Sequence, residues 1–469
     1  MLKRNIWTDL ITWKERKHHP LIIKGLRQIG KTFIVKKFGE EFYSHTVYID
    51  LRANKTIHEA FNGDFSVDQM VMSITANMPS ARFVPKKTLL ILDEIQDCPN
   101  ARSSLKYWDI DNRYDVIATG SFLGIKGFRA PYSRGIPVGY EEQLDMYPLT
   151  FNEFLINSGI SLNVLDYVNG CLEKVETIEK TVHQSIRSLY LQYLIVGGMP
   201  EACNSFFENH DLNNVRRIQR RILNSIKDDF GRYKDNFGND KINEVLKLRA
   251  EACLNSLPAQ LSKKYKKFQY SLVDAKGNSP EKSDGLQYIE DLGLVVKSYN
   301  TRELTYPLEG VKIPTEFKVF MIDTGLLISM LGKVIPAKIL NGDISAYKGA
   351  IAENMVASAF RAAGRELYYY HATSGSPELD FIYEENGNII LVECKSTNNR
   401  ATSLKFVLAN PKRFGLHDAI KFADTNVGQG EGFKTFPLYA LGFLKKESKS
   451  LIVDTINTSE IKAPDNWQK

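Results

Sequence analysis

The residues with the clearest capacity for chemistry lie near the start of the chain, in the run Gly25-Leu26-Arg27-Gln28-Ile29-Gly30-Lys31-Thr32. Their spacing matches the phosphate-binding loop G-x-x-x-x-G-K-[ST] in full. In such a loop, backbone N–H groups face phosphate oxygens at the start of a helix. The lysine would neutralise charge on the β- and γ-phosphates, and the threonine would hold Mg²⁺. The sequence therefore predicts an ATP site, with contacts from Gly25, Gln28, Ile29, Gly30, Lys31, Thr32 and Phe33.

Two carboxylates extend this expected site. Asp93 and Glu94 follow the apolar run 88–92. We expect Asp93 to reach the outer shell of the metal and Glu94 to orient and deprotonate the attacking water. Ser121 follows the next apolar run, where its hydroxyl would sense the γ-phosphate or simply lie in a turn that caps a helix. The sequence leaves these two roles of Ser121 open.

Phosphoryl transfer also needs a positive charge near the γ-phosphate in the transition state. The arginines considered for this role are Arg102, Arg113, Arg129 and Arg134. For each of them the competing interpretation is a solvated surface side chain.

A second group of ionisable residues precedes the C-terminus. Asn386-Gly387, between two β-rich runs, predicts a two-residue hairpin turn. In that register Asp380 faces Glu393 and Glu378 faces Lys395, and all four side chains share one face. Two facing carboxylates repel each other. A bound cation is therefore expected between Asp380 and Glu393, and Mg²⁺ prefers such oxygen ligands.

Two further residues could take part in that site. Lys395 shares the predicted face and would position or activate a water. Glu353 interrupts the apolar stripe of a predicted helix instead of lying on its solvated side. The competing interpretation is an inactive domain in which Lys395 only forms an ion pair with a neighbouring glutamate.

Two basic runs suggest contacts with an anionic partner. Arg216, Arg217, Arg220 and Arg221 gather on one side of a predicted helix, where like charges weaken a helix unless something binds them. A solvated helix face is the competing interpretation. The run 263–267 contains four lysines and lies between helices that would bind DNA phosphates or only connect parts of the protein. The sequence favours neither.

The elements that would position these residues are of α/β type and fall into four blocks. Strands are predicted over 21–24, 47–50, 88–92, 115–119, 294–299, 304–306 and 317–322. The alternation of strands and helices in the first block predicts a parallel sheet covered by helices. The blocks are an ATPase domain (1–150), a helical lid broken near Gly197 (151–235), a winged-helix-like module (236–335) and a second α/β domain (336–469).

Composition restricts the class of protein. The chain has 469 residues with 43% hydrophobic and 25% charged residues, which is typical of a multidomain globular protein. The net charge of +6 permits a nucleic-acid partner without requiring one. Five scattered cysteines form no C-x-x-C pair, which indicates reduced thiols. No run is long enough to span a membrane. We expect a soluble cytoplasmic protein.

The chain resembles prokaryotic AAA-superfamily ATP-binding proteins, which are related to archaeal ATPases and carry a C-terminal domain of unknown function. The resemblance rests on the stretches 20–32, 92–96, 118–121, 146–154, 197–201, 317–325 and 348–354. It implies a homo-oligomer, because such ATPases often complete their site with an arginine of a neighbouring subunit. This chain has Tyr140 where many relatives have a cation, so any role of that cation is vacant here or has moved.

Glu353, Asp380, Glu393 and Lys395 together resemble the core of PD-(D/E)XK nucleases. This resemblance implies a restriction-endonuclease-like fold and metal-assisted hydrolysis of DNA or RNA, with all four residues as catalytic candidates beside Lys31 and Glu94. The expected function is an Mg²⁺-dependent ATPase whose nucleotide state controls a nuclease-like domain. The alternative is an ATP-gated switch or scaffold whose nuclease-like domain only binds a partner.

Overall fold

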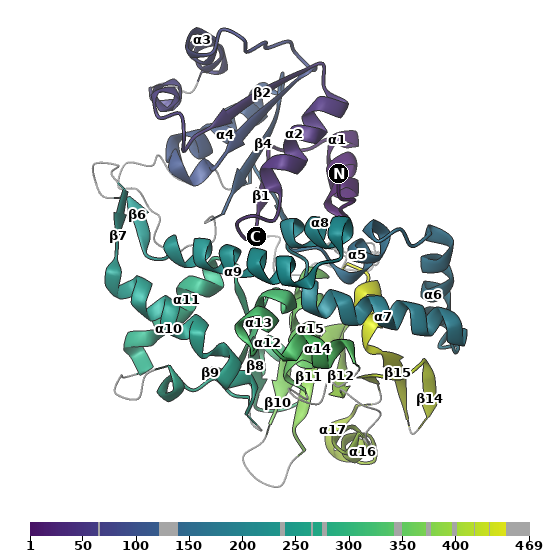
Figure 1. Cartoon of the computed structure of the whole chain (residues 1–469). Coiled ribbons are helices and arrows are strands. Elements are labelled where there is room, and N and C mark those ends of the chain that lie inside the picture. The colour runs from purple at the N-terminus through teal and green to yellow at the C-terminus, as the bar shows by residue number, and fades with distance from the viewer. Residues whose placement is uncertain are drawn as a thin grey trace, which may run out of the picture.

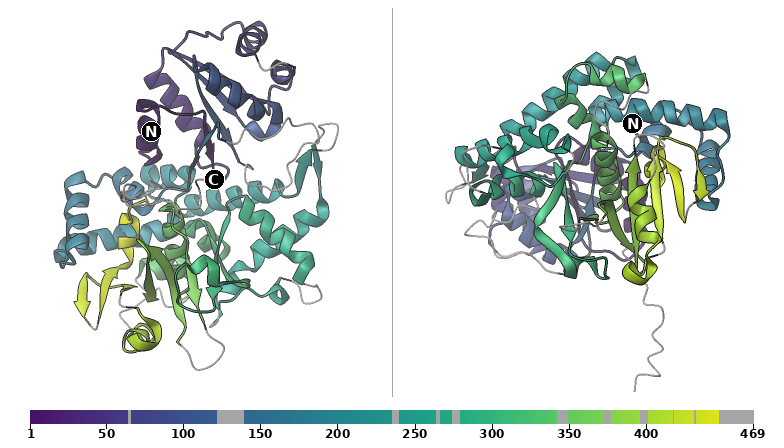
Figure 2. Two further views of the ribbon diagram at one scale, coloured as in Figure 1. Left: turned by 180° about the vertical axis from the view of Figure 1, so that it is seen from behind. Right: turned by 90° about the horizontal axis from the view of Figure 1, so that it is seen from below.

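The computed structural model describes residues 1–63, 66–121, 139–234, 240–263, 266–273, 279–341, 349–371, 377–395, 401–416, 418–430 and 432–446. Figure 1 shows three layers: a first sheet at one end, a layer of helices across the middle, and a second sheet at the other end. The reverse view in Figure 2 shows the same order. Arg129, Arg134 and Lys264, considered above, lie outside the described residues.

The first sheet has five parallel strands in the order β2-β3-β4-β1-β5. They are β1 (Leu21–Lys24), β2 (His45–Asp50), β3 (Thr88–Asp93), β4 (Asp115–Gly120) and β5 (Glu142–Asp145). Alternate side chains enter two cores, so that Ile23 lies in a core with α2 while Ile22 lies in a core with α4. The predicted parallel sheet covered by helices is confirmed.

Helices cover both faces of this sheet. They are α1 (Ile6–Glu15), α2 (Lys31–Phe42), α3 (Val67–Asn77) and α4 (Pro99–Asp111), with short 3₁₀ turns η1 (Thr56–Phe61) and η2 (Ile95–Asp97). Within the described residues, no helix combines the length and apolar character that a bilayer span requires.

The middle layer, which we call the helical layer, consists of α5 (Phe151–Asn157), α6 (Leu162–Lys174), α7 (Lys180–Val196), α8 (Pro200–Asn209) and α9 (Leu212–Asp228). A capping box fixes its start, because the Thr150 hydroxyl accepts from the Glu153 N–H and the Glu153 carboxylate accepts from the Thr150 N–H. The predicted break near Gly197 falls between α7 and α8. There the buried Asp323 carboxylate accepts from the Gly198 N–H at 2.6 Å and joins this layer to the next.

The next block contains β6 (Arg232–Lys234), β7 (Asp240–Ile242), α10 (Glu244–Leu261), η3 (Tyr270–Leu272), α11 (Ser279–Asp291), β8 (Val295–Thr301), α12 (Leu308–Val311) and β9 (Lys312–Met321). Strands β8 and β9 match two predicted strands approximately. Residues 304–306, predicted as a strand, form none. Their apolar residue Leu304 instead packs in a core beside β10.

The second sheet has eight strands in the order β14-β15-β13-β12-β11-β10-β8-β9. Its remaining strands are β10 (Tyr368–Tyr370), β11 (Leu379–Glu385), β12 (Asn388–Lys395), β13 (Ala419–Ala423), β14 (Gly428–Gly430) and β15 (Phe433–Pro437). The helical elements of this region are α13 (Thr324–Met330), α14 (Ile335–Leu340), α15 (Ala350–Ala362), α16 (Thr402–Leu408), α17 (Pro411–Phe414) and η5 (Leu438–Phe443).

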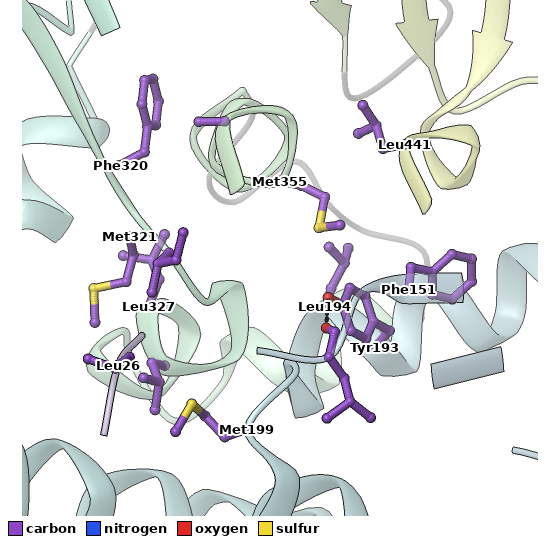
Figure 3. Packing of buried hydrophobic residues seen from close by; sticks show 14 of the residues in the cluster. Leu26, Phe151, Tyr193, Leu194, Met199, Phe320, Met321, Leu327, Met355 and Leu441 are labelled. Atoms are coloured by element: carbon purple, nitrogen blue, oxygen red, sulfur yellow. Dashed lines mark hydrogen bonds between the residues drawn. The ribbon is translucent and has the colours of Figure 1, made fainter. Parts of the chain in front are cut away.

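The second sheet crosses the predicted boundary between residues 335 and 336. Strand β8 pairs in parallel with β10, so β8 and β9 extend a sheet whose other strands come from the last block. This pairing could not be predicted from the sequence, because the two strands are about 70 residues apart and share no local pattern. Figure 3 shows the apolar core that links all these parts, from Leu26 in the first domain through Tyr193 and Met321 to Leu441.

Candidate functional site

The phosphate loop joins β1 to α2 and is held close to the segment after β5. A Cβ atom on Gly25 would lie 2.2 Å from the Met146 carbonyl oxygen, so only glycine fits at this position. Gln28 adopts a left-handed conformation with φ 64°, and its side chain donates to Ser225 Oγ of α9 at 3.1 Å. The loop is therefore positioned both by its own sheet and by the helical layer.

Lys31 begins α2 and points back into the loop. Its Nζ donates to the carbonyl oxygens of Gly25 and Leu26, both at 2.9 Å, and to Ser121 Oγ at 3.3 Å. The side chain is buried, and burial lowers the pKa of Lys31 to about 8. The loop therefore holds a desolvated cation where the motif requires one, and Ser121 contacts that cation.

Asp93 ends β3 beside the start of α2. The hydroxyl groups of Thr32 and Tyr48 each donate to its Oδ2 atom at 2.9 Å, and Thr119 of β4 donates to Oδ1. Tyr48 and Thr119 were not among the predicted site residues, although both lie near the ends of strands predicted to be parallel.

The residues at Asp93 fit a magnesium ion bound together with a nucleotide. The Thr32 hydroxyl and the Asp93 carboxylate are hydrogen bonded, so one ion beside the loop could contact both. Among the described residues there is no group of three His, Cys, Asp or Glu side chains arranged to hold a metal. Mg²⁺ typically uses one or two carboxylates and completes its shell with substrate phosphates and water. The donor set at this site is of that kind.

Glu94 follows Asp93 and adopts a left-handed backbone with φ 53°. Gln96 donates to its Oε2 atom, and Arg52 Nη2 lies 3.7 Å from the same oxygen. Arg52 also donates through Nε to Asp97 at 2.8 Å. The candidate base therefore interacts with the cation of the phosphate loop and lies next to Arg52, which no sequence motif marks.

The two described arginines that were candidates for the γ-phosphate are engaged elsewhere. Arg102 forms an ion pair with Glu141 at 2.7 Å. Arg113 pairs with Asp111 at 2.8 Å and with Asp68 at 2.7 Å, outside the loop. The structure does not bring either of them to Lys31 or Glu94.

A different arginine, Arg27, belongs to the phosphate loop itself. It forms an ion pair with Asp229 at the end of α9, and Arg232 Nη1 lies 3.2 Å from the other oxygen of Asp229. The only sequence signal for Arg27 is its charge at a variable position of the motif.

The predicted hairpin in the second sheet is confirmed. Glu385 pairs with Asn388 around the Asn386-Gly387 turn, and the ladder continues in register to Phe381 and Val392. Beyond that point the Asp380 carboxylate accepts from the Cys394 N–H at 2.9 Å. Asp380 and Glu393 therefore lie at the end of the regular ladder.

Three lysines surround the carboxylates of this second site. Lys266 forms an ion pair with Glu353, and Lys395 pairs with Glu393 and lies 3.6 Å from Asp380. Lys318 of β9 is 1% exposed, with its Nζ 3.4 Å from Glu378 and 4.0 Å from Glu353. Glu378 thus contacts Lys318, whereas the predicted hairpin register placed it opposite Lys395.

The carboxylates retain capacity for a cation despite these lysines. Glu353 Oε2 and Glu393 Oε2 are buried and have no hydrogen-bond partner. Burial, reinforced by Asp380, raises the pKa of Glu393 to about 7, and burial also raises the pKa of Glu353. Buried oxygen atoms without a hydrogen-bond donor suit a hard cation such as Mg²⁺. Among the described residues, however, Asp380, Glu393 and Glu353 do not form a three-residue group arranged to hold a metal.

The basic runs are largely engaged within the protein. Lys266 is buried against Glu353, so it does not face a nucleic-acid phosphate, and the exposed Lys267 pairs with Glu316 at 2.8 Å. On α9, Arg216 donates to the Leu331 carbonyl oxygen at 2.8 Å, and Arg221 pairs with Glu201. Among the arginines of this run, Arg221 is ion paired and Arg216 is bonded to the backbone, so contacts within the chain account for part of the charge.

Three family models match parts of the chain. Residues 17–155 match an AAA domain, and residues 187–334 and 348–441 match two domains of unknown function. Together with the full loop motif and the parallel sheet, the first match makes the N-terminal part an AAA-type P-loop domain that binds nucleotide. No match was found among curated proteins.

Several solved structures are similar to the chain. The Walker-type ATPase of Pyrococcus abyssi is 14% identical, covers 70% of this chain and 96% of its own, and has a TM-score of 0.41. The ORC2 protein of Aeropyrum pernix, in ADPNP–ADP complexes, is 12% identical with coverages of 73% and 91% and a TM-score of 0.30. The Thermotoga maritima RuvB Holliday junction branch migration motor is 14% identical with coverages of 63% and 89% and a TM-score of 0.29.

Proposed function

We propose that the chain hydrolyses ATP with Mg²⁺ in the AAA-type domain. The observation that supports this most directly is the convergence of Lys31, Thr32 and Asp93, with Glu94 next in the chain, at the ends of β1 and β3. Lys31 binds the β- and γ-phosphates, Thr32 and Asp93 hold the ion, and Glu94 accepts a proton from the attacking water. When bound, Mg²⁺ neutralises charge on the phosphates.

Release of inorganic phosphate from ATP tests this proposal. The full-length protein should release phosphate in Mg²⁺, and EDTA should stop the reaction. Lys31→Ala should lose nucleotide binding, because the loop then has no cation for the phosphates. The matched control is Lys37→Ala, since Lys37 lies on the same helix but pairs with Glu40 in solvent. Equal turnover by the Lys31→Ala variant would contradict the proposal.

A second candidate function is metal-dependent cleavage of DNA or RNA at Glu353, Asp380, Glu393 and Lys395. It is favoured by the two buried carboxylate oxygens that lack hydrogen-bond partners and by the nearby ammonium group of Lys395. The ion would be held by Asp380 and Glu393, and Lys395 would position a water. The alternative remains a domain that binds a partner without cleaving it.

Control of the second site by nucleotide is part of this proposal. Helix α9 contacts the phosphate loop through Ser225 and the segment after α13 through Arg216, which donates to the Leu331 carbonyl oxygen. A helix that contacts the phosphate loop and the block preceding the second site would couple the two sites if it has two arrangements that nucleotide distinguishes.

Cleavage assays separate the two candidates for the C-terminal part. The protein is incubated with Mg²⁺ or Mn²⁺ and plasmid, single-stranded DNA or RNA, with and without ATP. A nuclease should lose cleavage in Asp380→Ala and keep it in Asp418→Ala, which changes an aspartate outside the site. No cleavage by the wild-type protein, or equal cleavage by Asp380→Ala, would leave the switch or scaffold as the better account.

A further inference from the structure

The AAA-type site needs a cation beyond Lys31, and the structure offers one from the loop itself. Arg27 is the third residue of the motif, two residues after Gly25. The described arginines that the sequence had suggested, Arg102 and Arg113, are paired outside the site. Arg27 is therefore the loop's own candidate for the cation that stabilises the γ-phosphate.

The charge of Arg27 interacts with the charges of residues that follow β3. Its electrostatic neighbours include Glu94 and Asp97 after β3, and Arg52, which is itself 3.7 Å from Glu94. Lys31 also interacts electrostatically with Arg27. The γ-phosphate and the attacking water must lie between the loop cation and the base. The guanidinium group of Arg27, which belongs to the loop, thus interacts electrostatically with both the loop cation and the candidate base.

The present partner of Arg27, Asp229, has a second cation beside it. Asp229, at the end of α9, binds Arg27 through Oδ2 and lies 3.2 Å from Arg232 through Oδ1. Leaving a buried carboxylate without any cation would be expensive. Because Arg232 remains beside Asp229, Arg27 is able to leave without stranding that charge. A phosphate group carries more charge than a carboxylate and accepts two hydrogen bonds from a guanidinium group.

We propose that Arg27 is a catalytic residue that contacts the γ-phosphate in cis, with Asp229 as its counter-ion in the nucleotide-free protein. This inference rests on the proposed ATPase function. Water attacks the γ-phosphorus, the bond from that phosphorus to the β–γ bridging oxygen breaks, and Glu94 takes the proton of the water. Arg27 forms no covalent bond. It stabilises the charge on the transferring group, so the site does not depend on an arginine from a second copy of the chain.

Burial is consistent with a role in which Arg27 exchanges one anion for another. Its side chain is 18% exposed, and burial, followed by repulsion from Arg52, lowers the pKa of Arg27 to about 10. Arg27 therefore stays charged at neutral pH but is poorly solvated. Such a group gains more from an anionic ligand than a solvated surface arginine does.

The first test compares turnover with binding of a transition-state analogue in the full-length protein. Arg27→Ala should lower kcat by about 10³-fold, the effect typical of a catalytic arginine in this chemistry. It should bind ADP nearly as the wild type does, yet lose tight binding of ADP–aluminium fluoride. Arg113→Ala, which removes an arginine paired outside the site, is the control and should retain both properties.

Three results would overturn the assignment. Wild-type kcat in Arg27→Ala would show that Arg27 does not act on the phosphate. Parallel loss of ADP and ADP–aluminium fluoride binding would show that it only maintains the loop. The third is recovery of activity in a mixture of the Arg27→Ala and Glu94→Gln variants, because Arg27 of one copy would then complete the site of another. An arginine that acts in cis predicts no recovery. If the wild type itself hydrolyses no ATP, the proposed function fails, which is a separate outcome.

Discussion

At the residue scale, the fold removes the ammonium group of Lys31 from water at the position where phosphates are expected to bind. The loop surrounds its ammonium group with two carbonyl oxygens and one hydroxyl, all uncharged acceptors. Removal from water then disfavours the charged form, which accounts for its pKa of about 8. Phosphates replace that missing solvation, so binding of ATP should restore the ordinary basicity of the lysine.

Nucleotide affinity should therefore depend on pH. In the nucleotide-free protein the ammonium form of Lys31 predominates below pH 8, and the neutral amine predominates above it. Because ATP binds the ammonium form, affinity should be constant near pH 7 and should fall above pH 8 by up to about tenfold per pH unit. Titration calorimetry with a non-hydrolysable ATP analogue measures this. Unchanged affinity from pH 7 to pH 9.5 would contradict it.

The two candidate sites differ in how far the sequence could predict them. Lys31, Thr32, Asp93 and Glu94 follow from local motifs, because each motif fixes both the residue type and the adjoining element. Arg27, Lys266 and Lys318 could not be predicted as site residues, because their partners are far away in the chain. One feature of the sequence could have indicated that Lys318 is buried: it is a lysine in a strand whose next three residues are all apolar, and these are buried.

At the element scale, the β11–β12 hairpin gives the second site its register. Asn386 and Gly387 both have positive φ, 50° and 77°. This is the backbone of the tight turn that the Asn-Gly pair predicts, and its twist matches that of the adjoining strands. A local pair of residues thus determines that Asp380 and Glu393 end on neighbouring strands.

Replacing Gly387 should weaken the hairpin through its backbone alone. Nothing lies within 4 Å of a Cβ atom built on Gly387, so Gly387→Ala introduces no clash. The positive φ should nevertheless cost about 1 kcal/mol of unfolding free energy. Urea denaturation measures this loss.

Gly332→Ala provides the matched control for Gly387→Ala. Gly332 is equally open but has no positive φ, so this change should be neutral or stabilise by about 0.4–1 kcal/mol. Equal effects of the two substitutions would show that the turn is not as described.

Strands β8 and β9 could be predicted as elements, but the sheet that they join could not. Their own sequences predict strands, and the sheet they join is determined by contacts with β10, which follows nearly 70 residues later. Helices α10 and α11 precede them, as in the expected winged-helix-like module, but the two strands extend a larger sheet.

At the scale of the whole molecule, one apolar core joins the first domain, the helical layer and the second sheet. Lys266 and Lys318, which neutralise carboxylates of the second site, come from the block before residue 336. The C-terminal block therefore lacks both two strands of its sheet and two of its counter-ions when taken alone. The border expected between residues 335 and 336 therefore separates strands and counter-ions that belong to one folded unit.

A fragment of residues 336–469 should accordingly not fold by itself. It would expose the edge of β10 and leave Glu353 buried without Lys266, and breaking a buried pair in this way typically costs about 3–5 kcal/mol. Circular dichroism with urea titration should show no cooperative transition for the fragment, while the full chain shows one. A cooperative unfolding transition of the fragment would show that residues 336–469 fold without the rest of the chain.

The central claim is that the AAA-type domain hydrolyses ATP with Glu94 as the base. The most direct measurement is the fate of ATP bound to Glu94→Gln in Mg²⁺, followed beside the wild type. The amide keeps the shape of the side chain but accepts no proton, so turnover should fall by at least about 10²-fold while bound ATP persists unhydrolysed. Turnover of Glu94→Gln equal to that of the wild type would contradict the assignment of the base and the catalytic account built on it.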